Sequence, residues 1–266
     1  MSMPPPMQLP VRILFKGPST LMWTSMMGGP RSDMAFPRVV EQQLLARGRA
    51  CDVWNAAELG WPTRFLFKTW DAEVAAWQPD VLVLAVGHYE TLHAILPRWL
   101  ERLANTEHRR PGFHKWKRLF FRAVARVVLL TQKKVDGPWL KCTRRLNRSK
   151  AEVQGYIDMT SRVSSPLILL MELHEPTQVK QQWFRGWVPR ARVINSHLRE
   201  LAEKNADKNV RFLPISDLMD QFDPPTAEAL WADGIHFSSR FHRAIGDKIT
   251  EIVDEWAAGE SHLVHP

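Results

Sequence analysis

Ser19 follows a short apolar segment, and its hydroxyl group is a candidate nucleophile. Residues 11–15 form a mostly apolar run typical of a parallel strand that is buried on both faces, and Gly17 and Pro18 end this run with a turn. A hydroxyl group just beyond such a strand faces the crevice in which open α/β sheets bind their ligands. Because an isolated Gly-Pro-Ser sequence often only caps a helix or a turn, Ser19 indicates catalysis only together with other groups.

Asp233 and His236 are the candidate partners of Ser19. A serine attacks an acyl carbon when a base takes its proton, a carboxylate orients that base, and hydrogen-bond donors meet the oxygen that becomes negative. Asp233 and His236 are three residues apart, after the last expected strand and just before the last expected helix. An Asp-x-x-His sequence is common in solvated turns, so its position is more informative than its composition.

Five short apolar segments alternate with helical patterns along the chain. The expected strands are residues 11–15, 50–54, 81–86, 166–171 and 210–214. The expected helices are residues 32–47, 63–77, 91–105, 113–130, 190–204 and 239–257. Since each right-handed crossover must cover the sheet, this pattern predicts a three-layer α/β/α fold with a five-stranded parallel sheet. In the flavodoxin-like order 2-1-3-4-5, ligands bind between strands 1 and 3, beside Ser19 and residues 87–90.

The residues at these strand ends resemble the conserved blocks of the SGNH/GDSL hydrolase family, and the resemblance extends over the whole chain. Four blocks carry it: residues 17–19 (Gly-Pro-Ser), Asn55 with Gly60, residues 87–90 (Gly-His-Tyr-Glu), and Asp233 with His236, followed by residues 237–242. The resemblance implies the SGNH hydrolase fold, here with a basic helical insertion. It also implies a hydrolase that acts on ester bonds and needs no metal.

The resemblance assigns a role to each of these blocks. Ser19 would be the nucleophile, His236 the general base, and Asp233 the group that orients the histidine ring. The backbone N–H groups of Ser19 and Gly60 would be oxyanion donors. The remaining oxyanion or substrate-binding positions would come from the loop Gly87-His88-Tyr89.

Two of these positions depart from the family pattern. Pro18 replaces an Asp that is not part of the triad, and its ring fixes the backbone that leads to Ser19. Tyr89 stands where the family has an Asn whose side chain donates to the oxyanion. A phenol can donate a hydrogen bond but reaches farther, so either the pocket is reshaped around Tyr89 or His88 serves instead.

Composition indicates an ordinary globular protein. The 266 residues are 45% hydrophobic and 24% charged, which suits one large domain that buries a core. Two cysteines are too few for a disulfide framework, and no signal peptide or membrane-spanning run is expected, so the predicted location is cytoplasmic. The predicted organisation is a disordered tail (1–10), one SGNH-like domain (11–258) with a basic insertion at about 106–150, and a C-terminal tail (259–266).

Positive charge is concentrated in one segment. Sixteen Lys or Arg and three acidic residues between Arg98 and Lys150 give this segment a net charge of +13, whereas the rest of the chain carries −5. Within it, residues 113–130 form an amphipathic pattern. A solvated face or a lid over an acyl-binding cleft is the first expectation, and peripheral association with an anionic membrane or lipid surface the second. Nucleic acid is the last, because no recognised binding motif accompanies the charge.

The sequence gives no support for a cofactor or a metal. It contains neither a dinucleotide-binding glycine motif nor a P-loop. His88, Glu90 and His93, and likewise Glu172, His174 and Glu175, lack any known zinc-site spacing and are expected to be ordinary loop residues. His174 follows a strand and is expected to line the cleft.

Together these features predict a serine esterase that hydrolyses an acyl or acetyl ester through an acyl-enzyme on Ser19. The basic insertion favours an amphiphilic or anionic ester of small-molecule, lipid or glycan type. Two alternatives stay open: an acyltransferase that uses the same triad to acylate a sugar or other hydroxyl, and a non-catalytic protein that binds an anionic surface. Nothing in the sequence indicates an oligomeric state.

Overall fold

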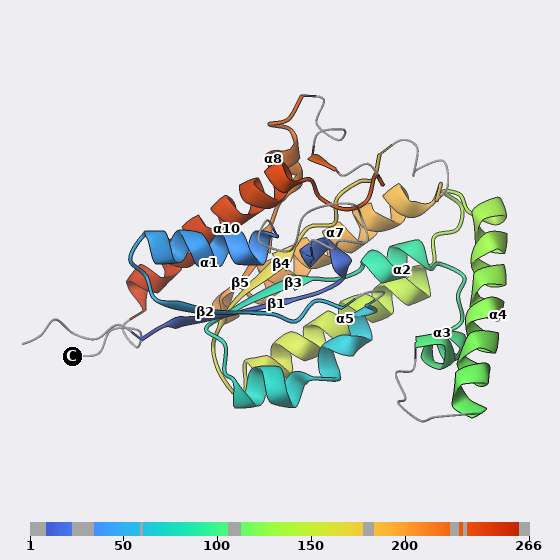
Figure 1. Cartoon of the computed structure of the whole chain (residues 1–266), viewed down its shortest axis with the longest axis horizontal. Helices are drawn as coiled ribbons and strands as arrows, with labels where there is room; N and C mark the ends of the chain where they lie inside the picture. The colour runs from blue at the N-terminus through green and yellow to red at the C-terminus, as the bar shows by residue number, and fades with distance from the viewer. Residues whose placement is uncertain are drawn as a thin grey trace, which may run out of the picture.

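The sheet has five parallel strands in the expected order. The structure is a computed structural model of the chain and describes residues 9–22, 35–58, 61–105, 113–177, 184–223, 229–230 and 233–260. The strands are β1 (Val11–Lys16), β2 (Cys51–Asn55), β3 (Val81–Ala85), β4 (Leu167–Met171) and β5 (Val210–Leu213). They pair side by side in the order β2-β1-β3-β4-β5, so the predicted α/β/α fold is confirmed (Figure 1).

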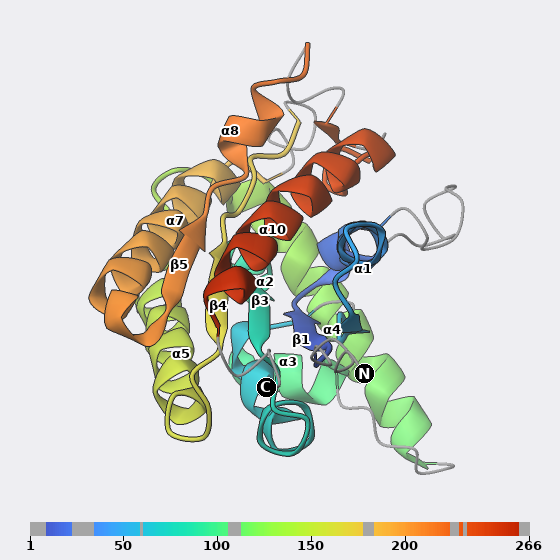
Figure 2. The same ribbon diagram turned by 90° about the vertical axis from the view of Figure 1, so that its left-hand side faces the viewer.

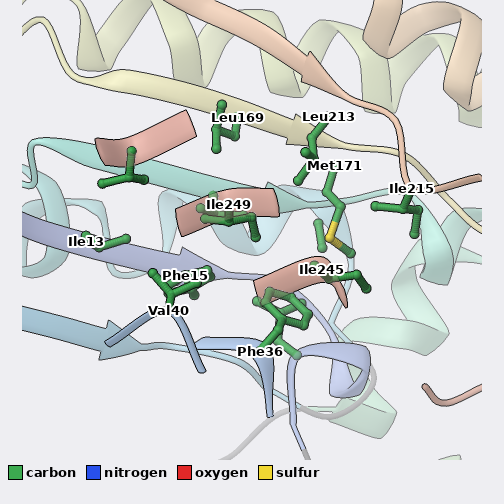
Figure 3. Packing of buried hydrophobic residues seen from close by; sticks show 14 of the residues in the cluster. Ile13, Phe15, Phe36, Val40, Leu169, Met171, Leu213, Ile215, Ile245 and Ile249 are labelled. Atoms are coloured by element: carbon green, nitrogen blue, oxygen red, sulfur yellow. The ribbon is translucent and has the colours of Figure 1, made fainter. Parts of the chain in front are cut away.

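Helices cover both faces of this sheet. Helices α1 (Phe36–Ala46) and α10 (Ser239–Gly259) lie on one face, and α5 (Thr143–Thr160) and α7 (Trp187–Lys204) on the other (Figure 2). Strand side chains alternate between two cores because successive residues of a strand point to opposite faces. Ile13 and Phe15 pack toward α1 and α10, as Figure 3 shows, whereas Leu14 joins the core beneath α5 and α7.

Further elements complete the described structure. They are the helices α2 (His88–Leu92), α3 (Arg98–Asn105), α4 (Phe113–Val135) and α8 (Ser216–Met219), the 3-10 turns Ser19–Leu21, Thr63–Phe67 and Ala206–Lys208, and a π-helical turn, Asp71–Ala76. Of the predicted tails, residues 1–8 and 261–266 lie outside the described residues, as do residues 32–34 of the first predicted helix.

The helix predicted over residues 91–105 is wrong. The structure has two helices there, α2 and α3, separated by residues 93–97. Pro97 is the reason, because proline has no N–H and its ring clashes with a preceding helical turn. Its carbonyl oxygen instead accepts the first hydrogen bond of α3, from the N–H of Glu101 at 3.0 Å.

The helix predicted over residues 63–77 is also divided. It consists of a 3-10 turn and a π-helical turn. This irregular segment surrounds the buried side chain of Lys16, whose Nζ donates to Thr69 Oγ1 at 2.7 Å and pairs with the Glu73 carboxylate. A charge taken out of water needs such partners, so the segment supplies them at the end of β1.

The basic segment contributes to two different parts of the molecule. Helix α5, which the sequence did not predict, packs in the layer beneath the sheet through Leu146, Val153 and Ile157. Helices α3 and α4 lie beyond that layer and pack mainly on each other (Figure 1). Among the described helices, none is long and apolar enough to cross a membrane.

A buried ion pair fastens the end of α4 to α7. The guanidinium of Arg190 donates to both carboxylate oxygens of Asp136, at 2.7 and 3.0 Å, and both side chains are almost fully buried. The same guanidinium donates to the carbonyl oxygens of Thr91 and Leu140, at 2.8 and 3.3 Å. Both carboxylate oxygens of Asp136 therefore have a partner. The side chain of Arg190, in α7, also connects the ends of α2 and α4.

Removing one member of this pair should strongly destabilise the protein. We expect Asp136→Ala to lower the free energy of unfolding by about 3–5 kcal/mol, because the charge of Arg190 would stay buried without its partner. Urea denaturation measures this loss. Asp158→Ala is the control, since its pair with Lys208 is largely exposed and is expected to contribute less than about 1 kcal/mol. Equal losses of unfolding free energy in Asp136→Ala and Asp158→Ala would contradict a special contribution of the buried pair to stability.

His242 connects α10 to α1. Its Nδ1 accepts a hydrogen bond from the N–H of Phe36 at 3.2 Å. Burial, and after it the nearby charge of His236, lowers the pKa of His242 to about 3. The folded protein therefore holds this ring neutral well below the pH at which it gains a proton in the unfolded chain.

Stability should consequently fall as the pH drops below about 6.5, where an unfolded histidine becomes protonated. Each buried neutral histidine costs about 1.4 kcal/mol of stability per pH unit below that value, until the pH reaches the pKa of the folded state. We expect His242→Gln to reduce the loss between about pH 6.5 and about pH 5 by roughly 2 kcal/mol. Urea denaturation at several pH values tests this, and parallel profiles for both proteins would refute it.

Candidate active site

Ser19 lies where β1 comes closest to β3. A Cβ atom at Gly17 would lie 2.5 Å from the carbonyl oxygen of Ala85, so only glycine permits this approach. The turn that follows is held by the N–H of Leu21, which donates to Pro18 O at 3.1 Å. The Asn55 side chain donates to Leu21 O at 3.1 Å. The turn that carries Ser19 is thus fixed to the ends of two neighbouring strands.

The three predicted triad residues lie in hydrogen-bond contact. Ser19 Oγ lies 2.8 Å from Nε2 of His236, and Nδ1 of His236 lies 2.5 Å from Oδ2 of Asp233. Since a carboxylate only accepts, the ring carries its proton on Nδ1, and Nε2 is left to accept the proton of Ser19. This arrangement has the order of groups that activates a serine.

Asp233 is held as a carboxylate. Its Oδ1 accepts from the N–H groups of Ile235 and His236, at 2.9 and 3.0 Å. Partial burial raises the pKa of Asp233, but hydrogen bonds from the ring and N–H of His236 and the N–H of Ile235 outweigh that effect, so the pKa lies below its ordinary value. The group beside the histidine ring therefore stays negatively charged at neutral pH.

The turn that carries Asp233 and His236 is attached to the core on both sides. Gly234 adopts a left-handed conformation with φ of 72°, and its carbonyl oxygen accepts from Thr177 N–H at 3.1 Å. Phe237 is fully buried, and the Ser238 side chain caps α10 by accepting from Phe241 N–H at 3.2 Å. The start of α10 thus sets the position of the histidine.

Two buried histidines lie beside the triad. His88 Nε2 and His174 Nδ1 are 3.4 Å apart, and the ring of His174 contacts that of Phe237, with 4.8 Å between centroids. Burial, and after it the charges of His174 and His236, lowers the pKa of His88 well below its ordinary value, and burial lowers the pKa of His174 to about 4. Both rings are therefore neutral at neutral pH.

The tautomers of the two histidines determine which ring nitrogen can donate toward the triad. Within the described residues, the buried atoms His88 Nδ1 and His174 Nε2 make no hydrogen bond. Each neutral ring carries one hydrogen, and one of the two hydrogens is used between the rings. If His174 donates to His88, the remaining hydrogen lies on His88 Nδ1. If His88 donates to His174, it lies on His174 Nε2, whose ring also has a hydrogen-bond interaction with the backbone of Ile235. Only the first arrangement leaves a donor without a partner next to the triad.

The other residues of the loop after β3 have different surroundings. Gly87 has a φ of 96°, and a Cβ atom there would lie 2.7 Å from the Ile194 side chain, so the position requires glycine. The ring of Tyr89 packs against His93, with 4.2 Å between centroids, and lies 5.8 Å from the Arg145 guanidinium. Gly60, the other predicted oxyanion donor, lies outside the described residues.

Two carboxylates near these loops have structural partners. Glu90 accepts from Thr63 N–H and Oγ1, at 2.9 and 3.0 Å. Glu172 accepts from Ser216 N–H and Oγ, at 3.0 and 2.6 Å, and so holds the start of α8. These hydrogen bonds explain how the carboxylates of Glu90 and Glu172 can be buried.

A pocket of about 560 Å³ opens beside His174, between the loop after β4 and helix α7. Its lining includes Leu173 and Met219, and two ion pairs, Arg192 with Glu175 and Arg199 with Glu172. The Asn195 side chain clamps this loop to α7, since it accepts from Leu173 N–H at 2.8 Å and donates to Leu173 O at 2.9 Å. The sequence did not single out these residues of α7, because helical periodicity does not show which polar side chains reach a distant loop.

Of the comparisons with known proteins, only the comparison with solved structures found matches to this chain. No protein-family model matches the chain, and no curated protein matches its sequence. Solved structures do match. A lipase/acylhydrolase from Enterococcus faecalis is 17% identical, with 93% of this chain and 97% of that chain covered and a TM-score of 0.57. A proposed GDSL-like lipase from Parabacteroides merdae is 16% identical, with 94% and 99% covered and a TM-score of 0.58.

A third solved structure is an esterase from Pseudoalteromonas inhibited by monoethylphosphonate. It is 11% identical, with 94% of this chain and all (100%) of that chain covered and a TM-score of 0.56. These identities are low, whereas the alignments run over nearly the full length of each chain. Together with the strand order, they show that this chain has the fold of the SGNH/GDSL hydrolases.

Proposed function

We propose that the protein is a serine esterase that forms an acyl-enzyme on Ser19. The observation that carries this proposal is the continuous path from Ser19 Oγ through the ring of His236 to the charged carboxylate of Asp233, at 2.8 and 2.5 Å. Such a path allows the serine proton to leave as its oxygen attacks a carbonyl carbon. The lipase and esterase names of the solved structures with this fold point to the same chemistry.

The reaction proceeds in two halves. Ser19 Oγ forms a bond to the ester carbon while its proton passes to Nε2 of His236. The bond between the carbon and the leaving oxygen then breaks, and the imidazolium returns that proton to the departing alcohol. In the second half the oxygen of a water molecule attacks the acyl carbon while its proton passes to the same nitrogen. The bond between that carbon and Ser19 Oγ then breaks, the imidazolium returns the proton to Oγ, and the carboxylic acid leaves. Asp233 remains a carboxylate and stabilises the imidazolium in both halves.

The tetrahedral intermediates need donors for the negative oxygen. By resemblance, the backbone N–H groups of Ser19 and Gly60 supply two of them. We assign the third to His88 rather than to Tyr89. His88 lies within electrostatic range of His236 and has a buried nitrogen without a partner among the described residues, whereas Tyr89 is packed against His93.

In this assignment His174 donates from Nδ1 to His88 Nε2, so the single hydrogen of His88 lies on Nδ1 and is directed to the oxyanion. A neutral ring suits the task because a donor must keep its hydrogen throughout the reaction. The lowered pKa values of both rings preserve that state at neutral pH. His174 thereby acts as a positioning residue.

The pocket beside His174 is the proposed substrate pocket. Its volume of about 560 Å³ suits a small or medium acyl or alcohol group. No triad residue lines it, so the assignment rests on His174, which belongs both to its lining and to the surroundings of His236. Acetylxylan esterases are among the solved structures with this fold, so acetylated sugars belong to the substrate classes to be tested beside short acyl esters.

Ser19→Ala should abolish ester hydrolysis. We expect kcat for p-nitrophenyl acetate and butyrate to fall by about 10⁴- to 10⁶-fold, because no other described group is placed to attack the ester carbon. A fluorophosphonate probe should label the wild type on Ser19 and leave the variant unlabelled. Ser165→Ala is the control and should retain full activity, because Ser165 is exposed and precedes β4, at the opposite end of the strands from Ser19. No turnover and no labelling of the wild type would favour a non-catalytic role.

His88→Phe should lower kcat by about 10²- to 10³-fold with little change in KM, because phenylalanine keeps the packing against His174 but removes the oxyanion donor. Tyr89→Phe removes only a hydroxyl group and is expected to keep kcat within a few-fold. Thermal unfolding of both variants checks that the fold is intact. A large fall in kcat for Tyr89→Phe, with His88→Phe unaffected, would transfer the role to Tyr89.

A further inference from the structure

The apolar contacts of the described part of helix α4 with α3 lie on one of its faces. Val124, Ala125 and Val128 contact Leu100 of α3 in a small apolar cluster. Near the other end, the Gln132 side chain donates to Leu92 O at 2.5 Å and accepts from Ile95 N–H at 3.3 Å. With the buried pair of Asp136 and Arg190, these contacts hold the helix in a fixed orientation.

A second apolar face of α4 is exposed. Its five large side chains, here called the exposed stripe, have exposed fractions between 50% and 76%: Trp116 76%, Leu119 50%, Phe120 63%, Val127 62% and Leu130 57%. At about 100° per residue, these positions fall within an arc of roughly 100° on the helix. The residues that contact α3 lie on a different arc. An ordinary solvated helix has polar residues on its outer face, so the exposed stripe needs another explanation.

Positive charge borders the exposed stripe. Arg122, Arg126 and Lys133 occupy an arc of about 40° directly beside it. The 23 residues of α4 include no Asp and no Glu. A surface that fits this helix must therefore accept apolar side chains and carry negative charge along one border.

We propose that α4 docks the protein on an anionic lipid surface, with the exposed stripe inserted at the level of the head groups. Such a surface offers acyl chains for Trp116 and Phe120 and anionic head groups for Arg122 and Arg126, which is the combination that interfacial helices use. The proposal concerns binding alone and does not depend on hydrolysis.

Other occupants fit less well. A second copy of the protein would bring a second row of cations beside the first, and α4 has no carboxylate to pair with them. A nucleic acid would neutralise the charge but would leave the exposed stripe in water. Helix α4 stands at the same end of the molecule as α2, which follows β3, so docking would place that end of the sheet toward the lipid (Figure 1).

Sedimentation of the full-length protein with vesicles tests the proposal. The wild type should bind vesicles of phosphatidylcholine and phosphatidylglycerol, and bind vesicles of phosphatidylcholine alone far less. Trp116→Gln with Phe120→Gln should reduce the partition coefficient about 100-fold, at roughly tenfold per large side chain. Leu45→Gln with Val193→Gln, at exposed apolar positions on other helices, is the matched control and should leave binding unchanged.

A second pair of variants tests the charge. Arg122→Gln with Arg126→Gln should reduce binding to the anionic vesicles about 30-fold, at about fivefold for each cation near the surface, and the remaining binding should weaken with salt. Arg185→Gln with Arg243→Gln removes two exposed charges elsewhere and should have little effect. Circular dichroism confirms that each variant is folded.

Three results would overturn the proposal. One is the absence of wild-type binding to the anionic vesicles. Another is binding that the variants at Trp116 and Phe120 do not weaken. The third is a wild-type dimer that the same variants convert to a monomer, without any vesicle binding, which would assign the exposed stripe to a second copy. Ser19→Ala should bind like the wild type, so failure of the proposed hydrolysis would not affect this outcome.

Discussion

The position of Ser19 depends on how closely the end of β1 approaches the end of β3. Gly17 makes this approach possible, because any side chain there would collide with the backbone of Ala85. The next residue, Pro18, has a fixed φ and no N–H, so the chain leaves the strand in a restricted direction. A serine placed by such a constraint has little conformational freedom, as the proposed role of nucleophile requires.

The remaining groups of the site reach Ser19 from loops that are each anchored to the core. Asn55 attaches the end of β2 to the serine turn, Asn195 attaches the loop after β4 to α7, and Thr177 attaches that loop to the turn of Asp233. These bonds join side chains to backbone and carry no chemistry themselves. They limit the movement of the catalytic groups, and an error of about 1 Å in such groups is costly for the rate.

Apolar runs such as residues 81–86 were sufficient to predict the three central strands, because a strand buried on both faces has few polar residues. The proposed triad was named from the position of Ser19 after a strand and from the resemblance of Asp233 and His236 to a family block before the last helix, and the structure brings the three side chains into hydrogen-bond contact. The interruption at Pro97 and the irregular turn around Lys16 were not predicted, because propensity over a window averages out a single proline or a tertiary contact. The sequence left the choice between Tyr89 and His88 open and did not indicate the ion pair of Arg190, because both depend on neighbours distant in sequence, which helical and strand periodicity cannot reveal.

The structure explains why the basic segment can differ in composition from the rest of the chain. The two helical layers over the sheet are complete with α1, α5, α7 and α10, so the core does not require α4. The exposed side chains of α4 are therefore free of the packing constraints that select apolar residues in the other helices. Large apolar residues such as Trp116 and Phe120 lower solubility when they face water, and folding gives no reason for their presence. Their placement beside a row of cations is most simply explained by a surface outside the protein.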